Sequence, residues 1–183
     1  KAPGIASVTM DSWTYTTDSS SGKKPVPVSP TNGIDNVKYY YKIKGSQDST
    51  YTDTMPMMAG SYTVKAVFSE TDNYKEITAT AEFSISKATP TLSVEGVAEK
   101  TYGDADFNLS VTKTGESAVT YSSDKHEVVA VDSQGKVTIK GTGEALITAS
   151  MAESTNYVAV SDTVTIRVKQ GNGYVENNSY PKA

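Results

Sequence analysis

The chain has one histidine, His126, and no cysteine, which narrows the catalytic chemistry that it can support. A nucleophilic site needs a base that is oriented by a third group and lies beside an activated serine, threonine or cysteine. His126 lies in the turn-like stretch 123–127 without the glycines of a nucleophile elbow. A zinc site would need several cysteine or histidine ligands. We therefore expect an exposed turn histidine in a protein that is not an enzyme.

Closely spaced carboxylates suggest a different chemistry, the binding of a cation. Asp104 and Asp106 lie in the stretch Gly103-Asp104-Ala105-Asp106, where they could hold calcium. Calcium takes roughly six to eight oxygen ligands, and the spaced Asp/Asn and glycine run of an EF-hand is missing. Turn formation is the expected role of these aspartates. Calcium remains the alternative, and no other cofactor is expected. A glycosidase pair would need a groove and a defined carboxylate separation, for which the sequence indicates no scaffold.

Aromatic side chains offer a binding surface. The run Tyr39–Tyr41 lies in a predicted strand, so Tyr40 takes one face and its two neighbours take the other. Lys38 and Lys42 share the face of Tyr40, which indicates that this face is exposed to solvent. With Trp13 or Tyr51, Tyr40 could stack on a sugar ring or anchor a protein partner. The alternative is that Tyr40 only covers the outer surface of the sheet.

An internal repeat organises the chain. Residues 60–87 align without gaps on residues 143–170, and 6 of the 28 positions are identical, where about two are expected from average residue frequencies. The identical pairs are Gly60/Gly143, Ala66/Ala149, Glu70/Glu153, Asn73/Asn156, Tyr74/Tyr157 and Thr80/Thr163. Each copy shows two alternating apolar runs joined by a corner, which predicts two strands. Tyr74 and Tyr157 recur at that corner, so we expect a structural role like that of the tyrosine corner of Greek-key sandwiches.

The repeat places the boundary between two modules at Lys87-Ala88-Thr89-Pro90, where a strand runs into a proline. We assign residues 1–87 to module 1, residues 88–170 to module 2, and the polar residues 171–183 to a tail or linker. The opening Lys1-Ala2-Pro3 is similar to the boundary, as if another module preceded it. The chain is therefore expected to be a fragment of a larger protein.

Composition and turn spacing predict the fold. The chain is rich in Thr, Val and Tyr, which suit strands, and it has 13 Gly and 7 Pro for turns. Strands are expected at 6–10, 13–16, 26–30 and 37–44 in module 1, with a loop at 18–24. In module 2 they are expected at 91–94, 107–111, 119–122, 128–131 and 136–140, with a tight turn at 132–135. Roughly seven short strands per module predict an all-β protein of two tandem immunoglobulin-like β-sandwich modules.

The net charge and the hydropathy of the sequence limit the classes of partner that we expect. The net charge is −4, and no basic run is present to neutralise a phosphate backbone, so nucleic acid is not expected as a partner. No stretch approaches the roughly 18 apolar residues of a membrane span, so no membrane insertion is expected within these residues. We expect a monomer whose partners are neighbouring modules of the same chain and, as an alternative, a host glycan or extracellular protein.

The sequence also resembles a known family. Module 2 contains KTYGDADFNLSVT and VTYSSDKHEVVAVDSQGKVTIKGTGEALITAS, followed by STNY. These segments resemble the bacterial Ig-like repeats, of the Big and MBG types, that occur in surface adhesins. Module 1, with VKYYYKIKGSQDSTYT, AGSYTVKAVFSETDNYKE and ATAEFSISKA, is similar to tandem repeats of large surface proteins in Gram-positive gut bacteria. Module 1 departs from the pattern at Thr17, where many such repeats have the glycine that follows Tyr102 in module 2.

The resemblance covers about residues 1–170 and implies an Ig-like sandwich, export to the bacterial cell surface, and a role as stalk or adhesive module. It carries over no catalytic or ligand-binding residue. Three roles remain open at this point: a spacer in a surface protein, a module that itself binds a glycan or protein, and an accessory region of a large secreted glycosidase or protease.

Overall fold

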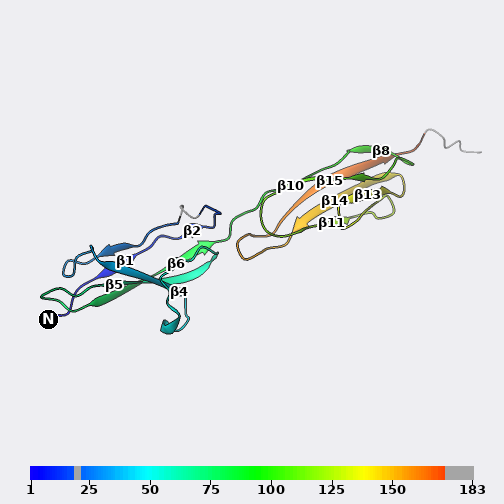
Figure 1. The fold of residues 1–183 in the computed structure, drawn as a ribbon. Helices are drawn as coiled ribbons and strands as arrows, with labels where there is room; N and C mark the ends of the chain where they lie inside the picture. The colour runs from blue at the N-terminus through cyan, green and yellow to red at the C-terminus, as the bar shows by residue number, and fades with distance from the viewer. Residues whose placement is uncertain (19–21, 172–183) are drawn as a thin grey trace, which may run out of the picture. The chain divides into compact units, whose positions relative to one another are not determined.

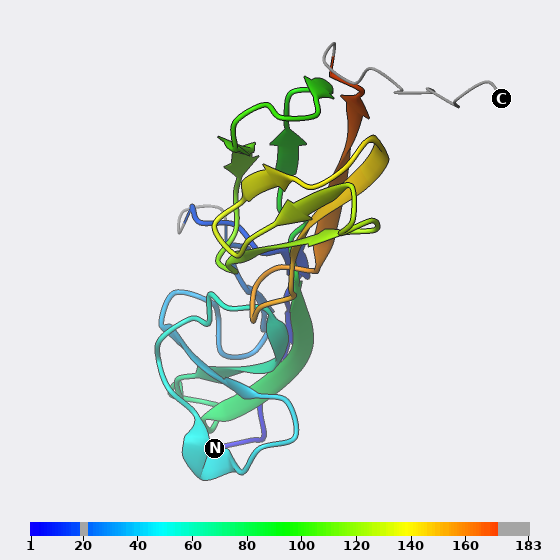
Figure 2. The same cartoon turned by 90° about the vertical axis from the view of Figure 1, so that its right-hand side faces the viewer.

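The computed structural model describes residues 1–18 and 22–171, and almost all of the regular structure in them is β-strand. Figures 1 and 2 show the strands, and the described residues also include the short 3₁₀ turn η2 (Asp48–Thr50). The chain divides into two compact units. Unit 1 comprises Lys1–Ala88 with Thr155–Tyr157, and unit 2 comprises Thr89–Ser154 with the described residues from Val158 on. The predicted tail lies outside the described residues except for Gly171, and the predicted loop 18–24 lies partly outside them.

Unit 1 is built on a four-stranded sheet in the order β2-β6-β5-β4. The strands are β2 (Trp13–Thr14), β6 (Ile77–Ser86), β5 (Gly60–Phe68) and β4 (Val37–Ile43). β2 runs parallel to β6, whereas the two other pairs are antiparallel. A second layer consists of the antiparallel pair β1 (Ser7–Thr9) and β3 (Val26–Val28). Val8 from this layer packs in one buried cluster with residues of β5 and β6, so the unit is a β-sandwich.

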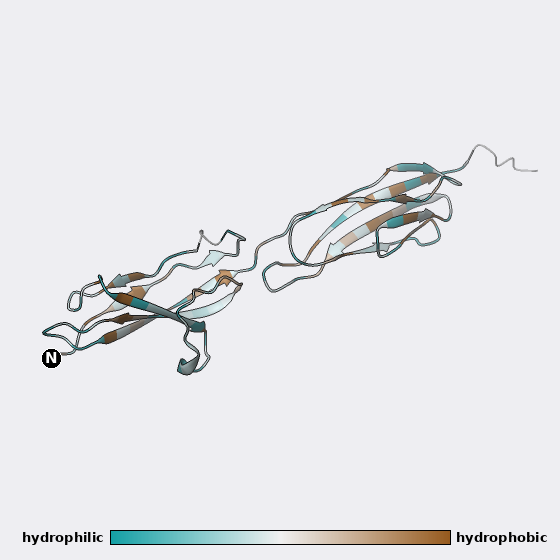
Figure 3. Ribbon diagram, viewed as in Figure 1, coloured by the Kyte–Doolittle hydropathy of each residue, from teal (hydrophilic) through white to brown (hydrophobic). Residues whose placement is uncertain are grey.

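The core of unit 1 follows from alternation along the strands, which Figure 3 shows as alternating hydropathy. On β5, Val64, Ala66 and Phe68 are buried, and the residues between them point to the other face. Phe83 of β6 lies at the centre of an aromatic group and is 4% exposed. Its ring stacks on Trp13 and on Tyr62, each with 5.5 Å between ring centroids, and Tyr41 meets its edge at 6.3 Å.

Unit 2 has the same four-stranded sheet, in the order β11-β14-β15-β8, with β8 parallel to β15. These strands are β11 (Val119–Ser123), β14 (Gly143–Met151), β15 (Val160–Lys169) and β8 (Glu99–Thr101). Two antiparallel groups form the rest of the unit: β7 (Leu92–Glu95) with β10 (Ser110–Lys113), and β12 (Val129–Val131) with β13 (Lys136–Ile139) and β9 (Phe107–Asn108). The predicted hairpin turn is confirmed: Gly135 has φ +79°, and the Asp132 carboxylate accepts the backbone N–H groups of Gln134 and Lys136.

Against the expectation of roughly seven strands per module, unit 2 has nine strands in its described residues and unit 1 has six. Between β4 and β5 it has the 3₁₀ turn η2 (Asp48–Thr50) and a loop, where unit 2 has the β12–β13 hairpin. In unit 2 that hairpin bonds to the neighbouring strand through the Leu109 N–H and the Gly135 carbonyl, 3.0 Å apart. The registers of β1–β3 and β7–β10 place Pro25 at the position of Leu109. Proline has no N–H, so unit 1 cannot form the hydrogen bond that Leu109 donates in unit 2.

Two further differences from the predicted strands concern unit 2. The strand expected at 107–111 is divided into β9 and β10, because Leu109 between them donates to Gly135 outside a regular ladder. β8 was not predicted, since its three residues, Glu99–Thr101, have no apolar alternation and its partner β15 is distant in sequence. The other predicted strands are present and differ in their ends by one or two residues.

Asp162 joins the two layers of unit 2 through its carboxylate, which accepts the Val94 N–H at 2.9 Å. This bond and the N–H of Thr163 hold the pKa of Asp162 below its usual range. A carboxyl group whose pKa is lowered by folding stabilises the protein above its unfolded pKa, and that stabilisation is lost as the pH falls through the folded value.

We therefore expect Asp162→Asn to lower the Tm of unit 2 at neutral pH, because the amide accepts these bonds without a negative charge. The difference from the wild type should shrink as the pH falls through the lowered pKa of Asp162, where the wild-type carboxyl also loses its charge. Thermal unfolding followed by circular dichroism, at neutral pH and over a series of acidic pH values, measures this. Glu95→Gln, on the exposed side of β7, is the control and should change little. An Asp162→Asn protein as stable as the wild type at neutral pH would contradict the assignment.

Candidate functional site

The outer face of the unit 1 sheet presents tyrosine and lysine side chains from adjacent strands. On β4, Tyr39 and Tyr41 pack against the core, and Tyr40 takes the opposite face as the alternation predicts. The register pairs Tyr40 with Lys65 of β5. Both side chains are half-buried.

Two tyrosine rings surround the ammonium group of Lys65. Its Nζ lies 5.4 Å from the ring centroid of Tyr40 and 4.1 Å from that of Tyr51. The Nζ of Lys42 lies 4.9 Å from the Tyr51 centroid. These distances fall within the range of cation–π attraction, so the four side chains form one connected surface. We call Tyr40, Tyr51, Lys42 and Lys65 the tyrosine–lysine face.

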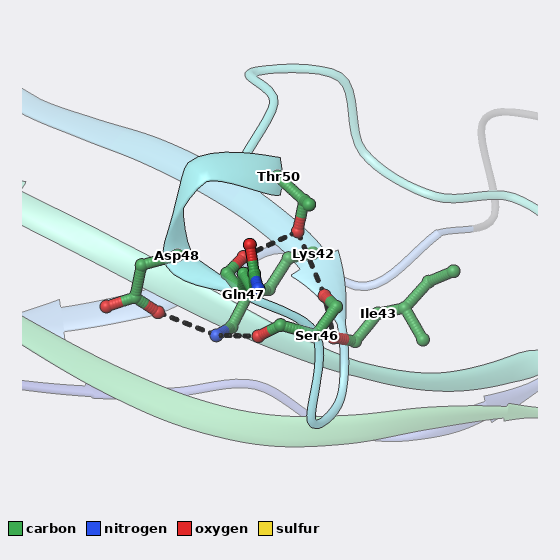
Figure 4. Close-up of polar contacts among 6 residues, drawn as sticks. All are labelled: Lys42, Ile43, Ser46, Gln47, Asp48 and Thr50. Carbon is green, nitrogen blue, oxygen red and sulfur yellow. Dashed lines mark hydrogen bonds and ion pairs between the residues drawn. The ribbon is translucent and has the colours of Figure 1, made fainter.

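Tyr51 follows the 3₁₀ turn in the loop after β4. Lys42 holds this loop in place (Figure 4). The Lys42 Nζ donates to the backbone carbonyl of Ser46 and to Oδ1 of Asp48, each at 2.7 Å. The side chain of Lys42 is only 11% exposed, whereas that of Asp48 is 87% exposed. The charge and hydrogen bond of Lys42 lower the pKa of Asp48, so the ion pair persists at neutral pH.

The hydroxyl groups of Ser46 and Thr50 form further hydrogen bonds within the loop. The Ser46 hydroxyl donates to the Ile43 carbonyl at 2.6 Å, and the Thr50 hydroxyl donates to the Gln47 carbonyl at 2.7 Å. The Ser46 and Thr50 hydroxyls are also 2.9 Å apart, as Figure 4 shows. Gly45 has φ +80°, a left-handed conformation that a side chain would strain. The loop therefore fixes the position of Tyr51 before any ligand arrives.

Burial raises the pKa of Tyr51; the nearby Lys42 opposes this shift and Asp48 adds to it. The Tyr51 hydroxyl therefore stays protonated at neutral pH and can donate a hydrogen bond. Stacking, hydrogen bonding and attraction of anions are the chemistry that this face supports.

We expect Lys42→Met to destabilise unit 1 by about 1–2 kcal/mol, because it removes two hydrogen bonds of a charged donor and keeps the apolar stem. Lys44→Met is the matched control: Lys44 pairs with Glu82 while 52% exposed, and exposed pairs contribute less than about 1 kcal/mol. Chemical denaturation of the two variants compares the effects. Equal losses would show that Lys42 is an ordinary surface lysine.

The structure brings together two of the three aromatic residues that the sequence suggested for ligand contact. Tyr40 and Tyr51 share the tyrosine–lysine face. Trp13 instead stacks on Phe83, and its strand β2 is at the opposite edge of the sheet from β4. Lys65 was missed, because nothing in its local sequence shows that β5 places it opposite Tyr40.

A groove with a volume of about 320 Å³ lies along β4 and the loop that follows it. Its lining is mostly apolar and hydroxyl-bearing, from Tyr41, Lys42, Ile43, Thr50, Thr52, Thr54, Met55, Pro56 and Tyr62. Thr52 pairs with Tyr41 through two backbone hydrogen bonds of 2.7 and 2.9 Å. The loop thereby covers part of the sheet edge.

The residues that the sequence suggested for catalysis or cation binding lie in a turn or contact other protein groups. His126 is exposed in a turn. Asp104 accepts the Thr101 N–H at 2.9 Å, and Asp106 forms an ion pair of 2.9 Å with Lys136. Among the residues that the structure describes, no cluster of three His, Asp or Glu side chains could hold a metal ion. Within the same residues, no helix is long and apolar enough to cross a membrane.

The repeated tyrosines lie at equivalent corners. Tyr74 forms a parallel bridge with Ala2, and Tyr157 forms one with Ala88. At the first corner, the Thr71 N–H donates to the Tyr74 carbonyl at 2.9 Å, and the Tyr74 N–H donates to the Thr71 hydroxyl at 3.1 Å. The first corner is thus held by backbone groups and the Thr71 hydroxyl, and a stabilising hydroxyl bond of either tyrosine stays a prediction.

Comparison with known proteins gives one family match. Residues 110–153 match the family model of the intimin immunoglobulin-like domain. The comparison with curated proteins gave no match.

Solved structures that resemble the chain are distant. Drosophila N-cadherin EC1-4 is 12% identical, with a TM-score of 0.40, over 91% of this chain and 50% of that one. The fibronectin(III)-like modules of Clostridium thermocellum CbhA are 18% identical, with a TM-score of 0.38, over 94% of this chain and 100% of that one. Domains 4 and 5 of the S-layer protein SbsC are 17% identical, with a TM-score of 0.36, over 92% and 100%. The chain thus spans about half the length of the N-cadherin structure.

At these scores the fold assignment rests on the strand pairing described above. The chain is an all-β protein of immunoglobulin-like sandwich units, and part of its second unit resembles the immunoglobulin-like domain of intimin.

Proposed function

We propose that the chain is a non-catalytic, extracellular pair of Ig-like modules, residues 1–87 and 88–170, that serves as a spacer in a larger bacterial surface protein. The match to the intimin domain supports a place among bacterial surface modules. The contacts of Asp104 in a turn and of Asp106 in an ion pair support a structural role for these two residues rather than a calcium site.

The path of the chain through each unit carries this proposal. In unit 1, Ala2 bonds to Asn73 and Lys75 just before β6 begins, and β2 then runs parallel to β6. The chain therefore enters beside the start of the last strand and leaves at that strand's far end. Unit 2 repeats the arrangement with Ala88 beside Asn156 and with β8 parallel to β15. Units with entry and exit at opposite ends add length when they are joined in series.

Small-angle X-ray scattering of the 183-residue chain tests the spacer role. A compact globule of this length has a radius of gyration of about 16 Å. A spacer should give a clearly larger value and the scattering profile of a rod. A radius near that of the globule would mean that the units fold back on each other, which a spacer would not do.

A second candidate function is ligand binding at the tyrosine–lysine face. The observation that favours it is the fixed position of Tyr51 and Lys65 beside Tyr40 on the outer surface of the sheet. A pre-ordered aromatic surface loses little conformational entropy on binding. This role is compatible with spacing, because the face uses no residue of the core.

A further inference from the structure

The lysines around Tyr40 differ in how their charge is balanced. Lys42 pairs with Asp48, and Lys44 pairs with Glu82, both at 2.7 Å. Lys38 and Lys65 have no carboxylate partner among the described residues. The outer face of β4 and β5 therefore has two lysines without a direct ion pair in the described residues, although the chain as a whole has a net charge of −4. Lys65 interacts only weakly with Asp48, whose pKa is lowered mainly by the hydrogen bond and charge of Lys42 and less by the charge of Lys65.

These two charges flank one aromatic ring. Lys38 lies two residues before Tyr40 on the same face of β4, a spacing of about 7 Å along a strand. Lys65 lies directly opposite Tyr40 in the register, with its Nζ near the Tyr40 ring. A ligand on Tyr40 would thus meet a cation on two sides.

The neighbouring side chains supply hydroxyl groups on an otherwise polar surface. Thr63 and Thr80 lie on the same outer face, opposite Lys42 and Lys65 respectively. The Tyr51 ring closes one end of the surface. Aromatic rings that pack on the C–H face of a sugar, together with hydroxyl groups that bond to its oxygens, are suited to a carbohydrate. Lysine carries a compact charge on a flexible stem and does not need the fixed geometry of one bidentate partner.

We propose that the tyrosine–lysine face, together with Lys38, binds an anionic polysaccharide. One sugar ring packs on Tyr40, and the carboxylates or sulfates of that sugar and its neighbours lie against Lys38 and Lys65. This inference rests on the proposed binding role of the face and specifies the class of its ligand.

The experiment measures binding of the full 183-residue chain to immobilised polymers by biolayer interferometry. Two matched pairs of probes distinguish the effect of the polymer's charge from that of its sugar chain. They are dextran with dextran sulfate, and methyl-esterified polygalacturonate with its free acid. Poly-glutamate represents an acidic protein. We expect binding to dextran sulfate, to polygalacturonate, or to both, with much weaker binding to the neutral polymers and to poly-glutamate. The comparison of the two charged polymers distinguishes sulfate from carboxylate as the preferred anion.

Variants then test the residues. Lys65→Gln and Tyr40→Ala should each weaken binding by about tenfold, in line with 1–2 kcal/mol for one such contact. Tyr40→Phe keeps the ring and should bind nearly as the wild type does. Lys100→Gln is the matched control: Lys100 also lies over an aromatic ring, 4.7 Å from the centroid of Phe107, but in unit 2. Unchanged circular dichroism and Tm confirm that each variant is folded.

The outcomes separate this inference from the binding role on which it rests. Equal, Tyr40-dependent binding to charged and neutral polymers would overturn the anionic ligand and keep a sugar-binding face. Equal binding to poly-glutamate would overturn the carbohydrate and point to an acidic protein partner. Charged-polymer binding that Lys65→Gln and Lys100→Gln weaken alike would overturn the site. Absence of binding to every probe would overturn both the ligand class and the binding role.

Discussion

Replacing Phe83 with alanine is expected to destabilise unit 1 by about 3–5 kcal/mol. The side chain is 4% exposed, and its ring contacts those of Trp13, Tyr62 and Tyr41, so the substitution would leave a cavity bordered by three aromatic rings. A domain of this size has a total stability of about 4–13 kcal/mol. The variant should therefore lose a large part of the stability of unit 1, and in differential scanning calorimetry its transition should fall by more than about 10 °C.

Two other variants show whether the aromatic group is responsible for this loss. Phe83→Leu keeps most of the volume and should cost clearly less than the alanine variant. Thr80→Ala, on the exposed side of the same strand, should leave the Tm within about 2 °C. If Phe83→Ala and Thr80→Ala gave similar transitions, Phe83 would not be the centre of the core.

Ile147→Ala is expected to destabilise unit 2 by about 2–5 kcal/mol. Ile147 has no exposed surface and packs in the buried cluster of that unit with Val129, Val137 and Ile166. Its neighbour Leu146 points to the other face of β14 and is 38% exposed. Leu146→Ala removes a similar number of carbon atoms, yet it should cost less than about 1 kcal/mol because no closed cavity forms.

Urea denaturation of these two variants compares the two faces of β14 one residue apart. The midpoint for unit 2 should fall strongly for Ile147→Ala and slightly for Leu146→Ala, with similar m-values in both. Reversal of this order would mean that the register of β14 is shifted by one residue, since such a shift exchanges the faces of a strand.

Local sequence was sufficient for much of the fold because alternation is a local property. The inward sets on β5, β6, β14 and β15 follow from the apolar alternation of the repeat. The Asp132–Gly135 turn follows from residue types that favour a tight reversal. Strand partners are not local. β8 was therefore not predicted, because it pairs with β15, which is distant in sequence. The missing hairpin of unit 1 also depends on a pairing that Pro25 cannot make.

The candidate site shows the same limit. The outward direction of Tyr40 follows from the alternation along β4, but its neighbours depend on strand register. Lys65 is 25 residues away in sequence, and Tyr51 arrives through a loop that a lysine, a serine and a threonine hold together. Trp13 was grouped with Tyr40 on residue type alone. Its contact with Phe83 depends on the parallel pairing of β2 with β6.

The parallel pairing of β2 with β6 and of β8 with β15 has a mechanical consequence. Tension applied between the two ends of a unit loads the hydrogen bonds of such a pair in shear, so they must break together. Unit 2 has three register pairs here, an Arg167 N–H bond to the Ala98 carbonyl, and the Lys169–Glu99 ion pair. Unit 1 has two register pairs, and at the matching position the Ser84 N–H donates to the Ser12 hydroxyl instead of to a backbone carbonyl. When the chain is stretched by optical tweezers, unit 1 should therefore yield at the lower force and act as the extensible element, while unit 2 stays folded.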